Sequence, residues 1–186
     1  MDFYGFYTGK IFDAYKYLGA HVEEKGVTFR TFAPSASRIT LIGEFNDWQE
    51  WEMNKVSDGN FWECYVPQAK AGQMYKYKIY DRNGNPVDHC DPYGFGMELR
   101  PSSASIIRDM SKYKFKDSQW LQSRSDCRKK PLNIYEIHFG SFRKPSDKAD
   151  DWYTYEDMID ILIPYLTKNG YNYLEIMPLN EYPNDL

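Results

Sequence analysis

Short stretches that alternate hydrophobic and polar residues dominate the first hundred residues, and clusters of turn-forming residues separate them. Four such stretches, 27–32, 38–43, 61–66 and 74–80, are strand candidates. In the last, Tyr75, Tyr77 and Ile79 share one face, and the other face carries Lys76, Lys78 and Tyr80. Short strands between turn clusters are typical of two packed antiparallel sheets. We therefore predict a mainly β domain, an immunoglobulin-like β-sandwich, over residues 21–108.

The stretch 38–48 has the clearest pattern. Its apolar run stops at Gly43, whose conformational freedom suits a strand end, and the turn formers Asn46 and Asp47 precede Trp48. This order predicts a buried strand with Trp48 at its exposed end. An exposed indole ring either plugs the edge of a core or offers a flat platform to a ligand. Upstream, residues 1–20 form an N-terminal extension, and the apolar spacing in 11–18 predicts a short helix.

A different pattern begins at Pro131. Residues 132–139 and 171–177 are strand candidates, and Thr154 with Asp157 three positions later is a helix-capping arrangement. The helix predicted between them has Gly170 just past its end, Pro164 inside it, and one apolar stripe of Met158, Ile159, Leu162, Ile163 and Leu166. Strand, helix and strand in this order predict a parallel βαβ unit over residues 132–186. The lysine- and arginine-rich stretch 109–131 is a connector.

A single βαβ unit cannot cover its own apolar faces or close its sheet edges. We therefore expect residues 132–186 to be the start of a (β/α)8 barrel, which needs about 250 residues, and the chain to be a piece of a longer protein.

Composition narrows the function classes. The chain has 186 residues, a net charge of −4 and no basic stripe, so nucleic acid is not expected as a partner. Aromatic residues are frequent, at 18%, with 17 tyrosines. An aromatic core explains most of them, and a carbohydrate-binding surface is compatible with the remainder.

The three cysteines, Cys64, Cys90 and Cys127, have no metal-site spacing and form no disulfide pattern. No metal and no cofactor is expected. The N-terminus lacks an apolar signal region, and no stretch is long enough to cross a membrane. The expected compartment is the cytoplasm.

Four separated motifs resemble the starch- and glycogen-binding module of carbohydrate-binding family 48: residues 43–48 (GEFNDW), 58–63 (DGNFWE), 75–79 (YKYKI) and 91–93 (DPY). The resemblance implies that Trp48 stacks on a glucose ring and that Lys76 contacts sugar hydroxyls. Stand-alone modules of this family carry a second stacking tryptophan where Asn85 and Pro86 stand here. Phe32 and Tyr65 are the substitutes we consider, although packing within their strands explains both more simply.

The C-terminal part resembles the first two barrel strands of the 1,4-α-glucan branching enzymes of glycoside hydrolase family 13, through residues 134–142 (IYEIHFGSF) and 173–183 (YLEIMPLNEYP). Residues 15–21 (YKYLGAH) also resemble these enzymes. The resemblance implies a retaining mechanism with a carboxylate nucleophile and a carboxylic acid/base, in which the 6-hydroxyl of another glucan chain replaces water. The motifs that carry those carboxylates are absent from residues 1–186, so no catalytic residue is assigned. The implied partners are α-1,4-glucan and the remainder of the barrel.

Other interpretations stay open at this point. The chain could be the corresponding piece of a debranching isoamylase or a trehalohydrolase. It could also be a glucan-binding module in its own right, or a spacer in which Trp48 is buried against the barrel.

Overall fold

The computed structural model describes residues 1–99, 101–148, 151–177 and 179. The chain forms two compact units, Met1–Lys114 and Phe115–Leu186.

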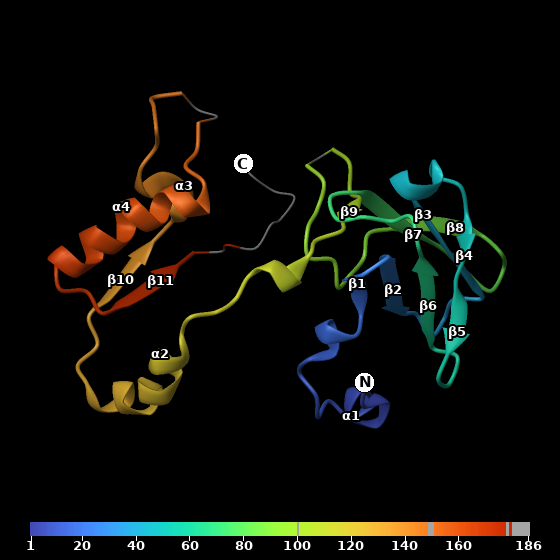
Figure 1. The fold of residues 1–186 in the computed structure, drawn as a ribbon, viewed down its shortest axis with the longest axis horizontal. Coiled ribbons are helices and arrows are strands. Elements are labelled where there is room, and N and C mark those ends of the chain that lie inside the picture. Colours follow the sequence, from blue (N-terminus) through green and yellow to red (C-terminus); the bar gives the residue numbers. More distant parts are fainter. Residues whose placement is uncertain (100, 149–150, 178, 180–186) are drawn as a thin grey trace. The chain divides into compact units, whose positions relative to one another are not determined.

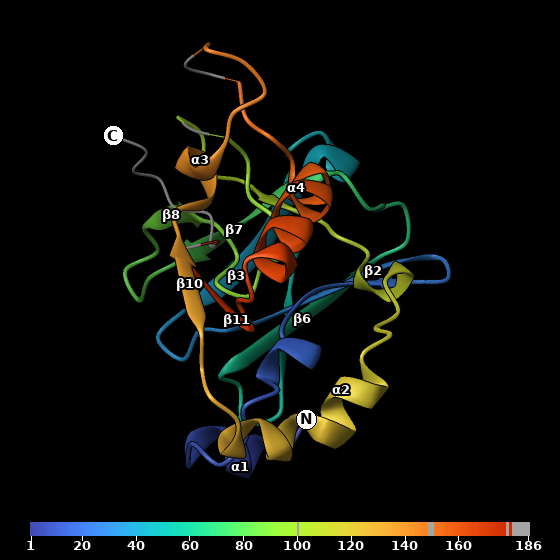
Figure 2. The same ribbon diagram turned by 90° about the vertical axis from the view of Figure 1, so that its left-hand side faces the viewer.

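Two antiparallel sheets make up the first unit (Figures 1 and 2). The first sheet has the order β1-β2-β6-β5, with β1 Gly19–Glu23, β2 Gly26–Phe32, β6 Phe61–Val66 and β5 Asn54–Val56. The second sheet has the order β4-β3-β7-β8, with β4 Trp51–Glu52, β3 Arg38–Gly43, β7 Met74–Tyr80 and β8 Pro86–His89. A further short strand, β9 Ser105–Ile106, also pairs with β7. The four predicted strands are confirmed. The shorter strands β1, β4, β5, β8 and β9 were not predicted, because they show no clear alternation of hydrophobic and polar residues.

One continuous core lies between the two sheets. Val27 and Phe29 of the first sheet and Ile39, Leu41 and Tyr75 of the second are almost fully buried in it. The Phe29 ring lies 4.9 Å from the ring of Tyr75, so aromatic contacts join the two inner faces directly. Burial of these alternate positions confirms the predicted β-sandwich.

The N-terminal extension packs on the outer face of the first sheet. Its helix is α1, Phe3–Tyr7, capped by the Asp2 carboxylate, which accepts a hydrogen bond from Gly5 N (2.9 Å). The rings of Phe3 and Phe6 lie 4.8 and 5.3 Å from the ring of Phe61.

The helix predicted over residues 11–18 is wrong. Only a 3-10 turn, η1 Ala14–Lys16, forms there, and Phe12 is 90% exposed. The apolar spacing of these residues is helical, but α1 already occupies the aromatic surface around Phe61 on the outer face of the first sheet.

In the second unit, β10 (Ile134–Ile137) and β11 (Tyr173–Ile176) pair in parallel, and α4 (Tyr155–Lys168) connects them. Thr154 and Asp157 form the predicted capping box. At the other end Tyr171 N donates to Leu166 O (3.0 Å) and Gly170, with φ of 76°, reverses the chain. The βαβ elements are therefore confirmed. This unit also contains α2 Ser118–Ser123, α3 Phe139–Phe142 and η4 Arg124–Lys129, and the first unit contains two further 3-10 turns, η2 Glu44–Asn46 and η3 Met110–Lys112.

The apolar stripe of α4 is narrower than predicted. Met158, Leu162 and Leu166 are buried, but Ile159 and Ile163 are 58% and 53% exposed. A pair of strands offers too narrow a surface to cover a whole apolar helix face. The motif 173–183 is described only in part, because residues 178 and 180–183 lie outside the described residues.

A buried carboxylate organises the end of the sandwich core. Asp91, 4% exposed, accepts hydrogen bonds from the hydroxyls of Tyr75 (2.7 Å) and Tyr77 (3.0 Å). Its other oxygen accepts one from Tyr93 N (2.8 Å). Burial raises the pKa of Asp91 above its ordinary value despite these hydrogen bonds. Burial, followed by the negative charge of Asp91, also raises the pKa of both tyrosines.

This pKa shift predicts a pH-dependent effect of Asp91→Asn. Because the folded pKa is raised, folding favours the protonated carboxyl, and this contribution to stability is lost as the pH rises from about 3.9 through the folded pKa. Asparagine has no such titration. We therefore expect wild type to lose stability relative to the variant as the pH rises through that window, measured by urea unfolding at several pH values. A stability difference that does not change with pH would contradict this account.

Candidate functional site

Trp48 lies on a tight turn at the end of a buried strand. After β3 the chain forms one 3-10 turn, η2 Glu44–Asn46, and then Asp47 and Trp48 both adopt left-handed backbone conformations, with φ of 53° and 59°. Trp48 N donates to Gly43 O (2.9 Å), which closes the turn. The Trp48 side chain is 40% exposed, as predicted for the end of this strand.

The Asn46 side chain holds this turn together. Its Oδ1 accepts a hydrogen bond from Gly43 N (2.9 Å), and its Nδ2 donates to Gln49 O (2.6 Å) and Leu41 O (3.3 Å). Two consecutive non-glycine residues in the left-handed region are unfavourable in isolation. The Asn46 amide binds the backbone on both sides of them, so it stabilises the conformation that presents Trp48.

Gly43 is required for a reason other than the predicted one. Its backbone is extended, with φ of −179°, a conformation open to any residue. A Cβ atom there would lie 2.6 Å from Met74 O and 2.7 Å from Phe45 Cε1. Close packing between η2 and β7, rather than backbone freedom, therefore selects glycine. The same junction is tied by Met74 N, which donates to Glu44 Oε2 (2.8 Å).

Lys76 lies at the same end of the second sheet as Trp48. Lys76 pairs with Ile42 across β7 and β3, next to Gly43, to which Trp48 is bonded. Its neighbours Tyr75 and Tyr77 point into the core, so Lys76 points to the outer face. Among the described residues the Lys76 side chain has no ion-pair partner. Its ammonium group can therefore donate hydrogen bonds to a ligand.

Polar side chains continue along this outer face of the second sheet. Glu50, between η2 and β4, accepts hydrogen bonds from the hydroxyl of Tyr80 (2.8 and 2.9 Å) and forms ion pairs with Arg38 (3.0 Å) and Lys78 (3.5 Å). The hydrogen bond from Tyr80, followed by the positive charges, lowers the pKa of Glu50. Sequence reasoning found the Lys78 and Tyr80 face but missed Glu50, which lies in a loop without any periodic pattern.

The structure does not bring Phe32 and Tyr65 to Trp48. Both lie on the outer face of the first sheet, where Phe32 pairs with Phe61 and Tyr65 pairs with Thr28. The ring of Phe32 lies 5.1 Å from that of Phe6 in α1. The Tyr65 hydroxyl donates to Lys25 O (2.7 Å). Their geometry fits packing and anchoring roles in the first sheet.

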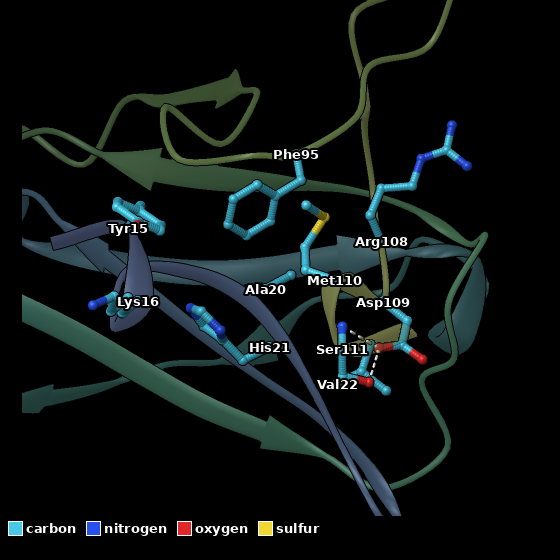
Figure 3. A pocket seen from close by; sticks show the side chains of 10 residues that line it. All are labelled: Tyr15, Lys16, Ala20, His21, Val22, Phe95, Arg108, Asp109, Met110 and Ser111. Atoms are coloured by element: carbon cyan, nitrogen blue, oxygen red, sulfur yellow. Dashed lines mark hydrogen bonds between the residues drawn. The ribbon is translucent and has the colours of Figure 1, made fainter. Parts of the chain in front are cut away.

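A separate pocket of about 280 Å³ opens beside β1 (Figure 3). Figure 3 shows the ring of Phe95 and the side chain of Met110 near each other, with Tyr15 and His21 on the opposite side. The His21 and Phe95 rings lie 6.3 Å apart, edge to face. The sequence did not predict a ligand site here, since the lining of this pocket comes from four separate segments.

Other kinds of site find little support in the described part of the chain. No cluster of three or more metal-ligating side chains occurs there. Cys64, Cys90 and Cys127 are free thiols, and burial raises the pKa of Cys64 to about 12. Among the helices of the described residues, none has the length and apolar character needed to cross a membrane.

Comparison with known proteins agrees with the predicted family. Residues 17–94 match the sequence profile of carbohydrate-binding module 48 (isoamylase N-terminal domain). The whole chain is 38% identical to 1,4-alpha-glucan branching enzyme GlgB of Fusobacterium nucleatum and covers 30% of that protein. It is also 38% identical over its whole length to GlgB of Geobacillus stearothermophilus, again covering 30%. The chain thus spans about 30% of the length of the curated relatives it matches.

Solved structures share the fold at lower identity. The catalytic module of the glycogen-degrading pneumococcal virulence factor SpuA is 20% identical, with a TM-score of 0.68 over 91% of this chain and 28% of that one. A GBS pullulanase SAP solved with maltotetraose is 19% identical, with a TM-score of 0.66 over 89% of this chain and 24% of that one. These likenesses establish the fold.

The Asn46 contacts predict that this residue positions Trp48. Asn46→Ala removes one acceptor and two donors, and we expect it to lower the free energy of unfolding by about 1–3 kcal/mol. Asn46→Asp keeps the acceptor for Gly43 N but directs a carboxylate oxygen at two backbone carbonyls, so it should be destabilising at neutral pH and partly recover at acidic pH. Urea unfolding measures both. An Asp variant as stable as wild type at neutral pH would show that the amide donors do not hold the turn.

Proposed function

We propose that this chain is the N-terminal, glucan-binding part of a 1,4-α-glucan branching enzyme, because residues 17–94 match carbohydrate-binding module 48 and the whole chain is similar to glucan branching enzymes. The complete enzyme would transfer an α-1,4-glucan segment to a 6-hydroxyl and so create α-1,6 branches in glycogen. The cytoplasm as its compartment belongs to the same proposal.

The observation that carries the proposal is that an exposed indole ring and an ammonium group without an ion-pair partner among the described residues lie at the same end of one sheet. A pyranose ring has an apolar face that packs on an aromatic ring, while its hydroxyls need hydrogen-bond donors and acceptors. Trp48, 40% exposed on a turn fixed by Asn46, supplies the aromatic ring. Lys76, at the same end of the sheet, supplies hydrogen-bond donors. The turn is rigid before a ligand arrives, so binding loses little conformational entropy.

The chemistry itself is assigned outside this chain. In the family that it resembles, the catalytic carboxylates lie on later barrel strands, and none of those motifs occurs in residues 1–186. The βαβ unit of β10, α4 and β11 would form the first part of that barrel, and the remaining barrel would cover the exposed Ile159 and Ile163. On this proposal the 186-residue chain binds glucan but does not branch it.

A debranching isoamylase or a trehalohydrolase is the main rival within the class. Similarity favours branching enzymes, because curated branching enzymes reach 38% identity over the whole chain, whereas the pullulanase and SpuA structures reach 19% and 20%. The other alternative is a spacer in which Trp48 serves stability alone. Glucan binding that depends on Trp48 distinguishes a binding module from this spacer.

The glucan-binding proposal predicts that Trp48→Ala weakens binding to maltoheptaose. Loss of one stacked ring should cost about 1–3 kcal/mol, by analogy with bases stacked on aromatic side chains. Isothermal titration calorimetry of the 186-residue chain, wild type beside the variant, measures this. Tyr65→Phe is a suitable control, since it changes one hydroxyl on the opposite outer face.

Each outcome has a distinct meaning. Saturable binding by wild type that Trp48→Ala weakens by this amount supports the platform. A variant that loses stability in urea unfolding but binds maltoheptaose as tightly as wild type supports the spacer. No binding by wild type would contradict a glucan-binding function for this chain on its own.

The assignment of catalysis to later strands gives a second prediction. Incubation of the 186-residue chain with amylose should leave the iodine absorbance of the amylose unchanged, because no carboxylate pair for glycosyl transfer is assigned in it. A complete branching enzyme incubated in parallel serves as the positive control. A fall in iodine absorbance with this chain alone would place catalytic residues within it.

A further inference from the structure

We propose that Tyr80 is a second glucan contact, at the far end of the same outer face that carries Lys76. The inference rests on the proposed function and extends it, because it makes the site longer than one sugar unit. Tyr80 was not among the residues that the sequence suggested for binding.

Strand register places Tyr80 on this face. Lys76, Lys78 and Tyr80 alternate with core residues along β7, and they pair with Ile42, Thr40 and Arg38 of β3. Tyr80 also pairs with Pro86 of β8, at the opposite end of the sheet from Gly43. Four strand positions separate Lys76 from Tyr80, a distance of about 13 Å. That length exceeds one glucose unit and suits an oligosaccharide.

The Tyr80 ring is fixed in place before any ligand binds. Its hydroxyl donates to Glu50 (2.8 Å), and the Arg38 guanidinium lies 4.6 Å from the ring centroid. Arg38 itself pairs with Glu50 at 3.0 Å, so the three side chains form one closed network. A partly exposed aromatic ring held in this way loses little rotamer freedom when a sugar packs on it.

The contrast with the first sheet supports a ligand role for this face. On the first sheet α1 covers the outer rings of Phe32 and Phe61, and Tyr17 stacks on the Arg30 guanidinium at 4.6 Å. On the second sheet Lys76, Lys78 and Tyr80 all keep intermediate exposure. Two lysines therefore precede an aromatic ring along a partly exposed row of β7, and aromatic surface together with hydrogen-bond donors is what a chain of pyranose rings requires.

The experiment compares short and long ligands on Tyr80 variants of the 186-residue chain. Tyr80→Ala should weaken binding of maltoheptaose by about 5- to 100-fold, the equivalent of one stacked ring. Maltose binding at Trp48, followed by tryptophan fluorescence, should not change, because the short ligand does not reach from Trp48 to Tyr80. Tyr80→Phe keeps the ring and should bind maltoheptaose nearly as well as wild type.

The matched control is Tyr4→Ala. Tyr4 is 70% exposed and has a stacked cation, Lys10 at 5.5 Å, but lies on α1 outside the second sheet. The Tyr4→Ala variant should bind maltose and maltoheptaose with wild-type affinity. Urea unfolding of Tyr80→Ala checks that the variant is folded. If it is not, Tyr80→Leu, which keeps an apolar side chain but has no ring, carries the test, with the same loss of maltoheptaose binding expected and wild-type binding overturning the inference.

Two results would overturn the inference. One is a Tyr80→Ala variant that is folded and binds maltoheptaose with wild-type affinity while Trp48→Ala binds it weakly; the proposed function would then stand without the second contact. The other is a loss in Tyr80→Phe as large as that in Tyr80→Ala, which would assign the effect to the hydroxyl network rather than the ring. If Trp48→Ala also binds like wild type, the proposed glucan function itself fails.

Discussion

The alternation of side chains along β7 is the constraint on which the sandwich and the candidate site both depend. Tyr75 and Tyr77 point inward, where their hydroxyls donate to the buried Asp91 at 2.7 and 3.0 Å. Because the inward positions are fixed so firmly, Lys76 and Tyr80 must point outward. A shift of register by one residue would expel both tyrosines from the core and bury the lysine, so core packing and ligand surface are specified together.

The two outer faces of the sandwich have different uses. The N-terminal extension covers part of the first sheet with aromatic contacts, such as that of Phe6 with Phe61 at 5.3 Å. On the second sheet the outward residues of β7 stay partly exposed, and the charged groups around Glu50 form ion pairs with one another. This difference explains why an aromatic-rich chain can have most rings in packing roles and still present Trp48 and Tyr80 at the surface.

The second unit illustrates local order without a complete core. Capping at Thr154 and the turn at Gly170 define both ends of α4, and the helix packs on β10 and β11. Ile159 and Ile163 nevertheless stay exposed, since two strands cannot cover the whole helix. The proposed function assigns these two side chains to contacts with the remainder of a barrel.

The sequence by itself determined the long strands, the capped helix and the exposure of Trp48, because periodicity and turn residues are local properties. Its motifs at 43–48 and 75–79 also gave the resemblance to carbohydrate-binding module 48, whose profile matches residues 17–94. Only the tertiary structure decided that the helix near the N-terminus is Phe3–Tyr7, that Gly43 is needed for space, and that Phe32 lies on the opposite sheet. It also brought Glu50 to Tyr80, a contact at 2.8 Å between residues 30 positions apart. Such contacts arise from strand pairing and packing, which no local pattern encodes.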